Sequence, residues 1–579
     1  MRTRFERGWV LRTPEARQVR EIREATGLSE PSARVLVNRG ITDPLGARDF
    51  LSGTLREVTS PFLMKDLEKA AARVVDAGRR NEKVLIYADY DVDGATGAAV
   101  LHLFLGEVFP GLPVRIHQNH RVDDGYGLRI PHLAAAAEEG FRLVVTVDCG
   151  ISDEEAIRQA AGLGMDVIVT DHHTPGERLP PAYAVLNPKQ NDCPYPEKEI
   201  AGVGVAFLLV CGVRRLLRDG GGFRGEGDEP NLRRYLDLVA LGTVADMVPL
   251  RGDNRLFVRA GIEEIRKRPR PGIRALLALA GVDPEHVTEA DLGFRVGPRL
   301  NAAGRMGDSR RSSELLLAGD PETAGRIARE LHADNARRQR EEERAVREAE
   351  EALRAGFPSG VPGAIVLADP GWPLGVLGIV ASKFAERYFR PSAFLTFKDG
   401  EATGSLRSAD GFPLLTALSE LSPLLSRYGG HSQAAGVSLP AENLPAFREG
   451  LDRLAGRYAQ GRDTSPATLV DAEVPLGEVS PRLLEEFDRL RPFGMGNEEP
   501  VLAARNLWVE RKTPFGGNGQ HHRLELSEGT RRFDAVAFQG ASIPAEPGEA
   551  VDILFTPQWS VFRGSRSIRL LVRGARPPA

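Results

Sequence analysis

Cysteine is scarce in this chain of 579 residues, and its scarcity excludes two kinds of architecture. The three cysteines, Cys149, Cys193 and Cys211, are too few for a disulfide framework or for a cysteine-rich zinc site. Because proteins without disulfides are typical of a reducing compartment, we expect this protein in the cytoplasm.

Long hydrophobic runs are missing as well. No apolar run reaches the roughly 18 residues that a membrane helix needs. The N-terminal sequence MRTRFERGWVLRT is charged and has no apolar core like that of a signal peptide. We therefore expect a soluble protein that makes no use of a membrane.

An excess of basic charge is the third absence. The chain has 76 Lys and Arg against 80 Asp and Glu, which gives a net charge of -4. A strongly basic chain would have pointed to nucleic acid, and this balance does not. A nucleic-acid site here therefore has to be a local basic patch, or an acidic cleft whose sign is inverted by bound cations.

Short apolar runs alternate with helical segments in the first half of the chain. Residues 83–88 (KVLIYA), 143–147 (LVVTV) and 166–170 (DVIVT) are almost continuously apolar, and residues 95–108 and 153–163 between them are typical of helices. This alternation predicts an α/β domain with buried parallel strands.

Five regions follow from the pattern along the whole chain. We expect a polar, helical region over 1–80, the parallel-sheet α/β domain over 81–320, and a long charged connecting helix over 321–356. A second, smaller α/β domain should cover 357–462, and closely spaced β-like runs over 463–579 predict a small β-barrel or sandwich.

Carboxylates and imidazoles follow each of the three predicted strands. The three ends read DYDVDG, DCG and DHH, and they supply Asp89, Asp91, Asp93, Asp148, Asp171, His172 and His173. Because ligands bind beyond the carboxyl ends of parallel strands, these side chains should form one cluster. A single acid at such a place often caps a helix or fills a turn. Three successive strands that each end in acids would bring like charges together, and because like charges repel, this pattern indicates a bound cation.

The types of ligand narrow the choice of metal. Carboxylate and imidazole without thiolate favour Mn²⁺ or Mg²⁺ over structural zinc. The number of acids also fits two divalent cations with one aspartate bridging them, an arrangement that activates water and stabilises the attacking and leaving oxygens of a phosphoryl displacement. Asp246, in LGTVADMVPL, is a further candidate ligand.

Groups that suit a polynucleotide lie near these motifs. Arg121 and Tyr126 flank a DDG turn and would supply a phosphate contact and a base contact. Arg299, Asn301 and Arg305 lie in GPRLNAAGR, where small residues let a ligand approach the backbone closely. The alternative for Tyr126 is packing against its neighbouring glycines.

Four segments resemble, in order, the signature motifs of the DHH phosphoesterases: DYDVDGATGAA, TVDCGIS, TDHHTPGERLPPAYAVLNP and LGTVADMVPL. Six more resemble the RecJ exonucleases: HRVDDGYGL, AGVGVAF, GPRLNAAGRM, GSLRS, GGHSQAAG and RPFGMGNEEP. The resemblance covers nearly the whole chain, from about residue 40 to the C-terminal barrel.

The resemblance implies a role for each residue of the cluster. Asp91, Asp148, His172 and Asp246 would hold one metal, and Asp89 and the bridging Asp148 the other. Asp93 would hold the turn into the next helix. His173, with Asp148, would act in catalysis by orienting the phosphate or sharing a proton. The alternative for His173 is a hydrogen-bond partner behind the ligands.

The second lobe resembles the part of the family that binds the strand end. There Arg121, Ser405 and Arg407 would clasp the 5′-terminal phosphate across the cleft between lobes, and His431 would contact the substrate. The alternative for the segment around His431 is a tight turn into a close-packed helix. Pro373 and Lys383 stand where the family carries a histidine and an arginine, which leaves the phosphate contacts of this lobe open.

The C-terminal region resembles the OB-fold that RecJ proteins add. OB-folds offer single strands a basic groove with aromatic side chains for stacking. The candidates here are Arg505, Trp508, Arg511, Lys512, Arg523, Trp559, Arg563 and Arg566. The alternative is that the two tryptophans fill the core of the barrel.

The family implies a 5′→3′ exonuclease of single-stranded DNA that releases 5′-mononucleotides in DNA repair and recombination. It also implies a monomer that works with a single-strand-binding protein and a RecQ-like helicase. One alternative is a DHH phosphodiesterase for short RNAs or cyclic dinucleotides, whose members generally lack the added barrel. The other is a non-catalytic DNA-binding replication scaffold, whose members lose the metal-binding residues that this chain keeps.

Overall fold

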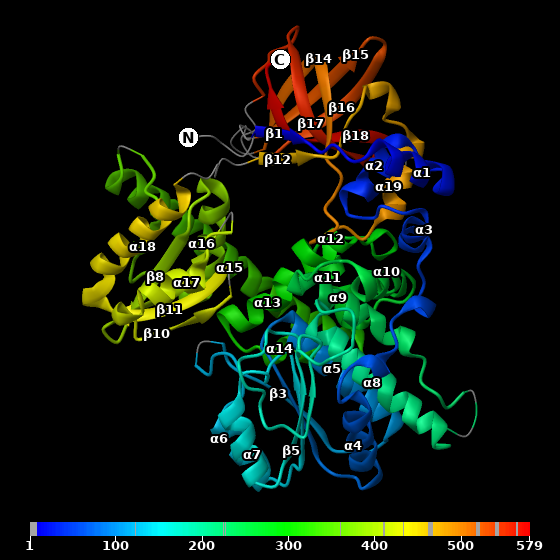
Figure 1. The fold of residues 1–579 in the computed structure, drawn as a ribbon, viewed down its shortest axis with the longest axis vertical. Coiled ribbons are helices and arrows are strands. Elements are labelled where there is room, and N and C mark those ends of the chain that lie inside the picture. The colour runs from blue at the N-terminus through cyan, green and yellow to red at the C-terminus, as the bar shows by residue number, and fades with distance from the viewer. Residues whose placement is uncertain are drawn as a thin grey trace. The chain divides into compact units, whose positions relative to one another are not determined.

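The computed structural model describes residues 8–121, 123–223, 225, 227–358, 360–408, 411–431, 433–460, 467–516, 521–538, 543–562 and 565–578. The chain divides into two compact units, shown in Figure 1. The parallel-sheet unit comprises 53–339 and 492–498, and the barrel unit comprises 1–52, 340–491 and 499–579.

The parallel-sheet unit contains a five-stranded sheet in the order β3-β2-β4-β5-β6, with every pairing parallel. The strands are β2 (Val84–Ala88), β3 (Val114–Gln118), β4 (Leu143–Val147), β5 (Asp166–Thr170) and β6 (Ala184–Leu186). The strands predicted at 83–88, 143–147 and 166–170 are therefore confirmed as neighbours in one parallel sheet.

Helices cover both faces of this sheet. Val84, Ile86 and Ala88 of β2 pack into the core formed with α4, α5 and α8, whereas Leu85 and Tyr87 pack on the side of α6 and α7. Figure 1 shows these two helical layers on opposite sides of the strands. The helices are α4 (Leu67–Arg79), α5 (Val92–Val108), α6 (Ile130–Glu138), α7 (Glu154–Gly162) and α8 (Gly202–Asp219). Burial on both faces explains the nearly continuous apolar strands.

Further helices extend this unit beyond the carboxyl edge of the sheet. They are α9 (Leu236–Asp246), α10 (Gly252–Lys267), α11 (Pro271–Leu279), α12 (Glu289–Asp291), α13 (Gly297–Met306) and α14 (Arg310–Leu317). A single π-helical turn, η5 (Leu292–Val296), joins α12 to α13. The helix α15 (Pro321–Gly356) has the bounds that the charged pattern predicts, and the division between the two units falls within it.

The barrel unit contains a mixed sheet in the order β10-β11-β9-β8-β7, in which only β7 and β8 are parallel. The end of α15 and α16 pack on one face, and α17 and α18 pack on the other. The elements are β7 (Ile365–Ala368), α16 (Leu374–Tyr388), β8 (Ser392–Lys398), β9 (Glu401–Arg407), α17 (Leu414–Glu420), β10 (Arg427–Gly430), β11 (Ala434–Pro440) and α18 (Leu444–Ala459).

The C-terminal strands close into a five-stranded barrel, which confirms the expected OB-like fold. The order is β14-β15-β16-β18-β17, and β17 pairs back onto β14. The strands are β14 (Leu502–Phe515), β15 (His521–Glu528), β16 (Arg531–Ala537), β17 (Ala550–Phe562) and β18 (Ser565–Arg576), with β13 (Ala472–Glu473) added beside β14. Closure removes the unpaired edges that an open sheet would expose.

The N-terminal residues belong to the barrel unit. The strand β1 (Gly8–Leu11) pairs in parallel with β12 (Ala467–Val470), so the expectation of helices alone over 1–80 is wrong at these residues. A four-residue, largely exposed strand leaves no alternation for sequence analysis to detect. The helices are α1 (Ala16–Thr26), α2 (Glu30–Asn38) and α3 (Pro44–Ser52), and α19 (Pro481–Leu490) packs against α2 and α3.

A buried ion pair fastens this N-terminal segment to the barrel. Arg39 Nη1 lies 2.9 Å from Asp471 Oδ1, and both side chains are 5% exposed. Asn38 donates to the same carboxylate, and the Val501 N–H donates to its other oxygen. Because every oxygen of Asp471 is used, the charge is compensated where it is buried.

Candidate active site

Three neighbouring strands each deliver an acid to the same edge of the parallel sheet. Asp89 follows β2, Asp148 follows β4 and Asp171 follows β5, and these strands are adjacent. All three side chains are buried. The cluster that the sequence predicts at the carboxyl ends of the strands is therefore present.

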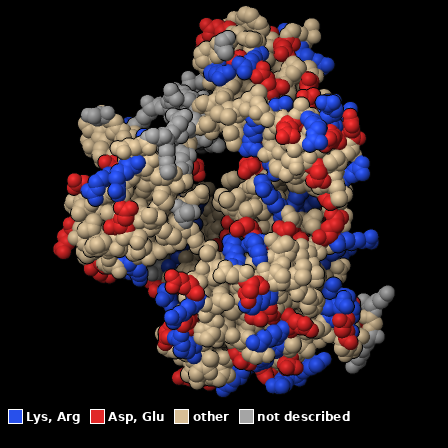
Figure 2. Space-filling view, in the orientation of Figure 1, with Lys and Arg blue, Asp and Glu red and all other residues tan. Residues whose placement is uncertain are grey.

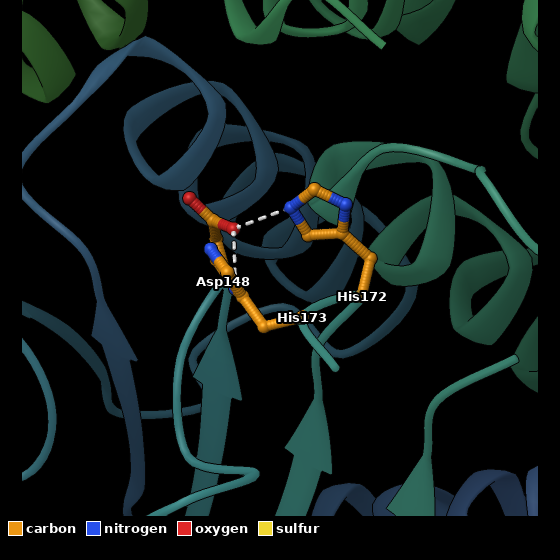
Figure 3. Close-up of side chains that lie close together, drawn as sticks. All are labelled: Asp148, His172 and His173. Atoms are coloured by element: carbon orange, nitrogen blue, oxygen red, sulfur yellow. Dashed lines mark ion pairs between the residues drawn. The ribbon is translucent and has the colours of Figure 1, made fainter. Parts of the chain in front are cut away.

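Asp148 lies at the centre of this cluster in a strained backbone conformation. Its φ of 59° is in the left-handed region, which costs a residue with a Cβ about 1–2 kcal/mol. Its Oδ1 lies 3.1 Å from His172 Nε2 and 3.7 Å from His173 Nδ1, between the two rings (Figure 3). Such strain persists at functional sites, where the surrounding structure holds it in place.

Three groups of side chains bring ligand atoms within 4.8 Å of one another. Asp89, Asp91 and Asp148 form the first group, and Asp148 forms the second with the two histidines. The third contains Asp93, His172 and Asp246. Asp148 belongs to two of the groups, which is the geometry that a bridging carboxylate requires.

The grouping differs in part from the expected ligand sets. Asp91 lies with Asp89 and Asp148, and not in the group of His172 and Asp246. His172 Nε2 lies 3.6 Å from Asp246 Oδ2 and 3.8 Å from Asp93 Oδ2.

The carboxylate of Asp93 does not make the contact that was expected of it. Its two carboxylate oxygens accept hydrogen bonds from the backbone N–H groups of Gly202 and Val203, at 2.7 and 2.9 Å. It therefore holds the start of α8, whereas Asp91 caps α5 through the Gly94 N–H. The carboxylate that caps the helix after β2 is therefore that of Asp91.

Burial and mutual repulsion disfavour the ionised form of these acids. Burial raises the pKa of Asp148 well above its ordinary range, and the charges of Asp93 and Asp91 raise it further. The pKa of Asp89 is raised by burial and by Asp91. Burial raises the pKa of Asp246 to about 7, and Asp91 again adds to it. A positive charge at this place would relieve the repulsion.

The side chains fit a divalent cation with oxygen and nitrogen ligands. Asp89 Oδ1 and Asp246 Oδ2 are buried and accept no hydrogen bond from the described part of the chain. Buried carboxylate oxygens that accept no hydrogen bond indicate a place for a positively charged partner. The set of oxygens with one or two imidazole nitrogens suits Mn²⁺ or Mg²⁺.

Cation binding should compete with protons near neutral pH. Folding raises the pKa of Asp246 from 3.8 to about 7, so the contribution of this group to the stability of the metal-free protein falls as pH rises from about 4 to 7 and changes no further above that. A bound cation requires the deprotonated form. We expect Mn²⁺ affinity to fall by about tenfold or more from pH 8 to pH 6. Titration calorimetry in two buffers would measure affinity and proton release, and equal affinities at both pH values would contradict this.

His173 is oriented by two neighbours. Its Nδ1 lies 2.8 Å from Asp171 Oδ1 and 3.0 Å from the Tyr126 hydroxyl, which donates to the carbonyl oxygen of Asp148. Burial lowers the pKa of His173, but the hydrogen bond to Asp171 and the charge of Asp171 outweigh this effect and raise the pKa above its ordinary value. These two contacts hold the Nδ1 side of the imidazole in place.

Asp171 organises this edge of the site, a role that sequence analysis did not assign. Its carboxylate accepts hydrogen bonds from the backbone N–H groups of Ile151, His172 and His173. Burial opposes its ionisation, but its hydrogen bond with His173 and the charges of both histidines keep its pKa below the ordinary value. The only sequence signal was its place at the end of β5.

A cavity of about 310 Å³ opens onto the carboxylates. Arg121, Tyr126, Asn301 and Arg305 line it, so four of the expected substrate contacts surround the expected metal ligands. The cavity lining consists of Asp89, Tyr90, Asp91, Arg121, Tyr126, Asp148, His173, Ala245, Asp246, Asn301 and Arg305. Asn301 Oδ1 accepts the Val92 N–H, which ties α13 to the first turn of α5.

Arg299 lies outside this cavity lining. Its guanidinium donates to the carbonyl oxygen of Arg295 and to His332 Nδ1, at 3.2 Å for the latter. Burial, and then the charge of Arg295, lower its pKa. Its part in substrate binding stays a prediction.

A buried amide holds the loop that carries Arg121 and Tyr126. Asn119 Nδ2 donates to the carbonyl oxygens of Gly125 and Gly127, at 2.9 and 2.6 Å. Its Oδ1 accepts a hydrogen bond of 2.6 Å from the Tyr87 hydroxyl of β2. Both glycines have positive φ, of 73° and 89°, which other residues rarely adopt. Asn119 thus connects the strand that ends at Asp89 to the loop over the cavity.

Asn119→Asp should misplace this loop without removing a ligand. Aspartate has the shape of asparagine but places a carboxylate oxygen where the amide nitrogen of Asn119 donates. That oxygen would face the carbonyl oxygens of Gly125 and Gly127, which accept hydrogen bonds from the wild-type side chain. We expect kcat/KM on a nucleic-acid strand to fall about tenfold, since small misplacements are costly in catalysis. Mn²⁺ affinity should be unchanged within a factor of about two. Asn443→Asp is the matched control, because Asn443 likewise donates to a carbonyl oxygen, that of Leu424. Equal losses in the two variants would show that the effect is general destabilisation.

Ser405 and Arg407 lie on β9 of the barrel unit, with Leu406 between them facing the core. A Cβ added to Gly378 of α16 would lie 2.9 Å from Arg407 Nη2 and 3.5 Å from Ser405 Oγ. The absence of a side chain at Gly378 therefore lets the two polar groups approach the helix backbone closely. A hydroxyl and a guanidinium on alternate residues of one strand suit a phosphate group.

The segment GGHSQAAG includes the last two residues of β10 and the first three of β11, and its Ser432 lies outside the described residues. His431 is exposed, its N–H donates to the Ala434 carbonyl oxygen, and Ala434 pairs with Arg407 in the sheet. The alternative of a turn into a helix is wrong, because the segment continues as a strand. Of the two departures from the family, Pro373 precedes α16, and Lys383 forms an ion pair with Glu342.

The barrel offers aromatic and basic side chains on its surface. Trp508 is 52% exposed, so it does not fill the core. The Arg566 guanidinium lies 3.7 Å from the ring centroid of Trp559. Arg505 pairs with Glu473, Lys512 pairs with Glu546, and Arg563 lies outside the described residues. On the face drawn in Figure 2 basic and acidic side chains are interspersed, as the balanced composition predicts.

Within the described ranges, no helix is both long and apolar enough to cross a membrane. Three family models match the chain. Residues 83–243 match the DHH family, N-terminal domain, residues 361–457 match the DHHA1 domain, and residues 470–574 match the RecJ OB domain.

Curated relatives match most of the chain. The single-stranded-DNA-specific exonuclease RecJ of Bacillus subtilis is 34% identical over 98% of this chain and 70% of its own length. The protein of the same name from Dickeya dadantii is 37% identical over 91% of this chain and 93% of its own length.

Solved structures match the fold. The crystal structure of RecJ in complex with Mn²⁺ from Thermus thermophilus has a TM-score of 0.83 and 30% identity, over 99% of this chain and 80% of that one. Its complex with Mg²⁺ matches with a TM-score of 0.76 and 28% identity, over 99% and 79%.

Proposed function

The chain belongs to the RecJ family of single-stranded-DNA-specific exonucleases, and from this premise we propose that it is a divalent-cation-dependent 5′→3′ exonuclease that releases 5′-mononucleotides. The observation that carries the proposal is the cavity in which acids and an imidazole face two arginines, Arg121 and Arg305. Carboxylates for cations and guanidinium groups for phosphates are the two components that phosphodiester hydrolysis requires.

Asp89, Asp91, Asp148, His172 and Asp246 are proposed to hold two divalent cations, Mn²⁺ or Mg²⁺. The Thermus structures that match this fold are complexes with these two ions. Bound there, the cations supply a water that loses its proton near neutral pH and neutralise charge on the phosphate. The orphaned oxygens of Asp89 and Asp246 support the assignment.

The chain's own side chains position the scissile phosphate. Arg121 and Arg305 line the cavity and can pair with phosphate oxygens by charge-assisted hydrogen bonds. Asp171 holds His173 Nδ1, and the raised pKa of His173 favours the imidazolium, whose Nε2–H can bind a phosphate oxygen. Tyr126 closes the cavity wall beside His173 and offers its ring edge to a base.

The polarity of digestion rests on the barrel unit. Ser405 and Arg407 are proposed to bind the 5′-terminal phosphate, with His431 as a further contact at the adjacent turn. Their placement on one strand, against the bare backbone of Gly378, supports this role. Arg299 and the exposed residues of the barrel are proposed to bind the strand further along.

Two other functions fit the observations less well. A DHH phosphodiesterase for short RNAs or cyclic dinucleotides has no need of a barrel that matches the RecJ OB domain over 470–574. A non-catalytic scaffold has no need of the aligned carboxylates around Asp148. The family resemblance also suggests a monomer in the cytoplasm that acts in repair and recombination, with a single-strand-binding protein and a RecQ-like helicase as partners.

Product analysis tests the proposed function directly. The full chain is incubated with Mn²⁺ and single-stranded DNA labelled at either the 5′ or the 3′ end. We expect labelled mononucleotide to appear at once from the 5′ label and only at the end from the 3′ label. The opposite order would overturn the polarity, and duplex DNA degraded equally well would overturn strand specificity.

A further inference from the structure

Phe294 is exposed to an unusual degree for an aromatic residue. Its exposed fraction is 84%, although its neighbours Leu292 and Val296 in the same π-helical turn are fully buried. Single π-helical turns inside α-helices are rare and occur frequently at functional sites. The π-helical turn continues directly from α12 into α13. Phe294 points outward from this turn, whereas Leu292 and Val296 remain in the core.

Two other exposed apolar side chains, Met247 and Met495, lie in the same unit of the chain. Met247 is 72% exposed and directly follows the cavity residue Asp246, and η5 packs on this end of α9. Met495 is 53% exposed, and its carbonyl oxygen accepts the Leu250 N–H. We call Met247, Phe294 and Met495 the Phe294 patch. The helix α9 contacts both η5 and α13.

Phe294 precedes α13, the helix that carries two residues of the cavity lining. Asn301 and Arg305 of α13 line the cavity, and Arg295 and Arg299 stand between them and Phe294 in sequence. The Arg295 side chain is 53% exposed. Phe294 precedes Asn301 by seven residues, which corresponds to about 10 Å along a helix axis at a rise of about 1.5 Å per residue. Phe294 thus lies about two helical turns from the cavity residue Asn301.

We propose that Phe294 is a stacking platform for a nucleobase of the single-stranded substrate, outside the cleavage cavity. Proteins that bind single strands without regard to sequence combine a cationic track for the backbone with aromatic faces for the bases. Arg295, which is half-exposed and pairs with Asp291, is the basic residue next to the ring in sequence that would meet the phosphates. This inference rests on the proposed function, because it takes a single DNA strand as the substrate.

Replacement of Phe294 separates stacking from a general apolar contact. Phe294→Ala should weaken binding of a 5′-phosphorylated oligothymidylate by about 5- to 30-fold, the lower part of the range for aromatic–base stacking. Phe294→Tyr should retain affinity, whereas Phe294→Leu, which keeps apolar volume but no ring, should lose nearly as much as alanine. The full chain is titrated by fluorescence anisotropy in EDTA, so that no hydrolysis is expected, and KM is measured with Mn²⁺. Leu163→Ala is the control, since Leu163 is 44% exposed at the opposite end of the sheet, before β5.

An abasic scan locates the base that Phe294 holds. A single abasic nucleotide is placed in turn at each position from the 5′ end, and each strand is tested with wild type and Phe294→Ala. At one or two positions the abasic change should weaken wild-type binding as much as Phe294→Ala does, with no further loss when the two are combined. No such position, or full affinity in Phe294→Leu, would overturn the proposal and leave a protein partner as the occupant of the patch. If the wild type fails to degrade single-stranded DNA, the proposed function fails instead.

Discussion

Replacing Asp148 with alanine should reduce hydrolysis of single-stranded DNA by at least about a thousandfold, or about 4 kcal/mol in the barrier. Asp148 is the carboxylate common to two of the three ligand groups and lies between His172 and His173. Its loss removes a ligand from both proposed cation positions. Mn²⁺ binding, followed by titration calorimetry, should therefore weaken at both positions together.

Asp148→Asn should show nearly the same defect without a change of shape. Asparagine tolerates positive φ better than alanine, so it suits the backbone conformation at this position. It also removes a charge that the neighbouring acids repel, so the metal-free variant should be at least as stable to heat as the wild type near neutral pH. Loss of hydrolysis together with an unchanged melting temperature would therefore show that Asp148→Asn impairs the reaction and not the folding of the protein.

Asp166→Ala is the matched control for Asp148. Asp166 begins β5 at the opposite edge of the same sheet and pairs with Arg73. Its replacement should leave Mn²⁺ affinity and kcat within a factor of about three, because Asp166 lies at the far end of the strand and Arg73 keeps its second partner, Glu82. Substantial Mn²⁺-dependent activity in a folded Asp148→Asn protein would contradict the assignment of a bridging ligand.

The second large effect is expected at Arg407. Arg407→Ala should lose about 1.5–3 kcal/mol of interaction with a 5′-phosphorylated strand, or about 10- to 150-fold, the range for hydrogen bonds to a charged group. On a strand with a 5′-hydroxyl the loss should be small, because that end offers no phosphate to bind. Single-turnover rates on the two strands with wild type and variant give the coupling between Arg407 and the phosphate.

Two further variants test the nature of this contact. Arg407→Lys keeps the charge but loses the planar fork that binds two phosphate oxygens, so it should also be impaired. Arg427→Ala is the control, since Arg427 is an exposed arginine on β10 of the same sheet. If Arg407→Ala lowers the single-turnover rate by the same factor on the 5′-phosphorylated strand and on the 5′-hydroxyl strand, Arg407 does not bind the 5′-phosphate.

Much of the metal cluster was predictable from the sequence for a simple reason. A run such as LVVTV identifies a buried strand by local composition, and the carboxyl ends of parallel strands meet at one edge of the sheet. The acid after each strand was therefore expected beside the others. The length of α15 was predictable on the same local basis, because the charged pattern with its apolar stripe runs unbroken through Pro321–Gly356.

The exact contacts of that cluster were not predictable, because they join residues that are distant in the chain. Asp93 was expected to hold the next turn, but its carboxylate binds Gly202 and Val203, the latter 110 positions away. The loop of Arg121 reaches the cavity because Asn119 binds both the loop and Tyr87, 32 positions earlier. No periodicity in the sequence encodes such pairs.

From short-range patterns the sequence predicted the acids and imidazoles at the strand ends, the parallel strands that carry them, the long helix and a C-terminal β-barrel or sandwich. Each of these depends on short-range patterns of apolar and polar residues or on turn residues next to them. Only the tertiary structure decided that β1 joins the barrel unit, that Arg39 neutralises Asp471, and that Phe294 remains in water beside the cavity. These features depend on which surfaces meet when the chain packs, and packing selects partners by shape and charge at any separation in sequence.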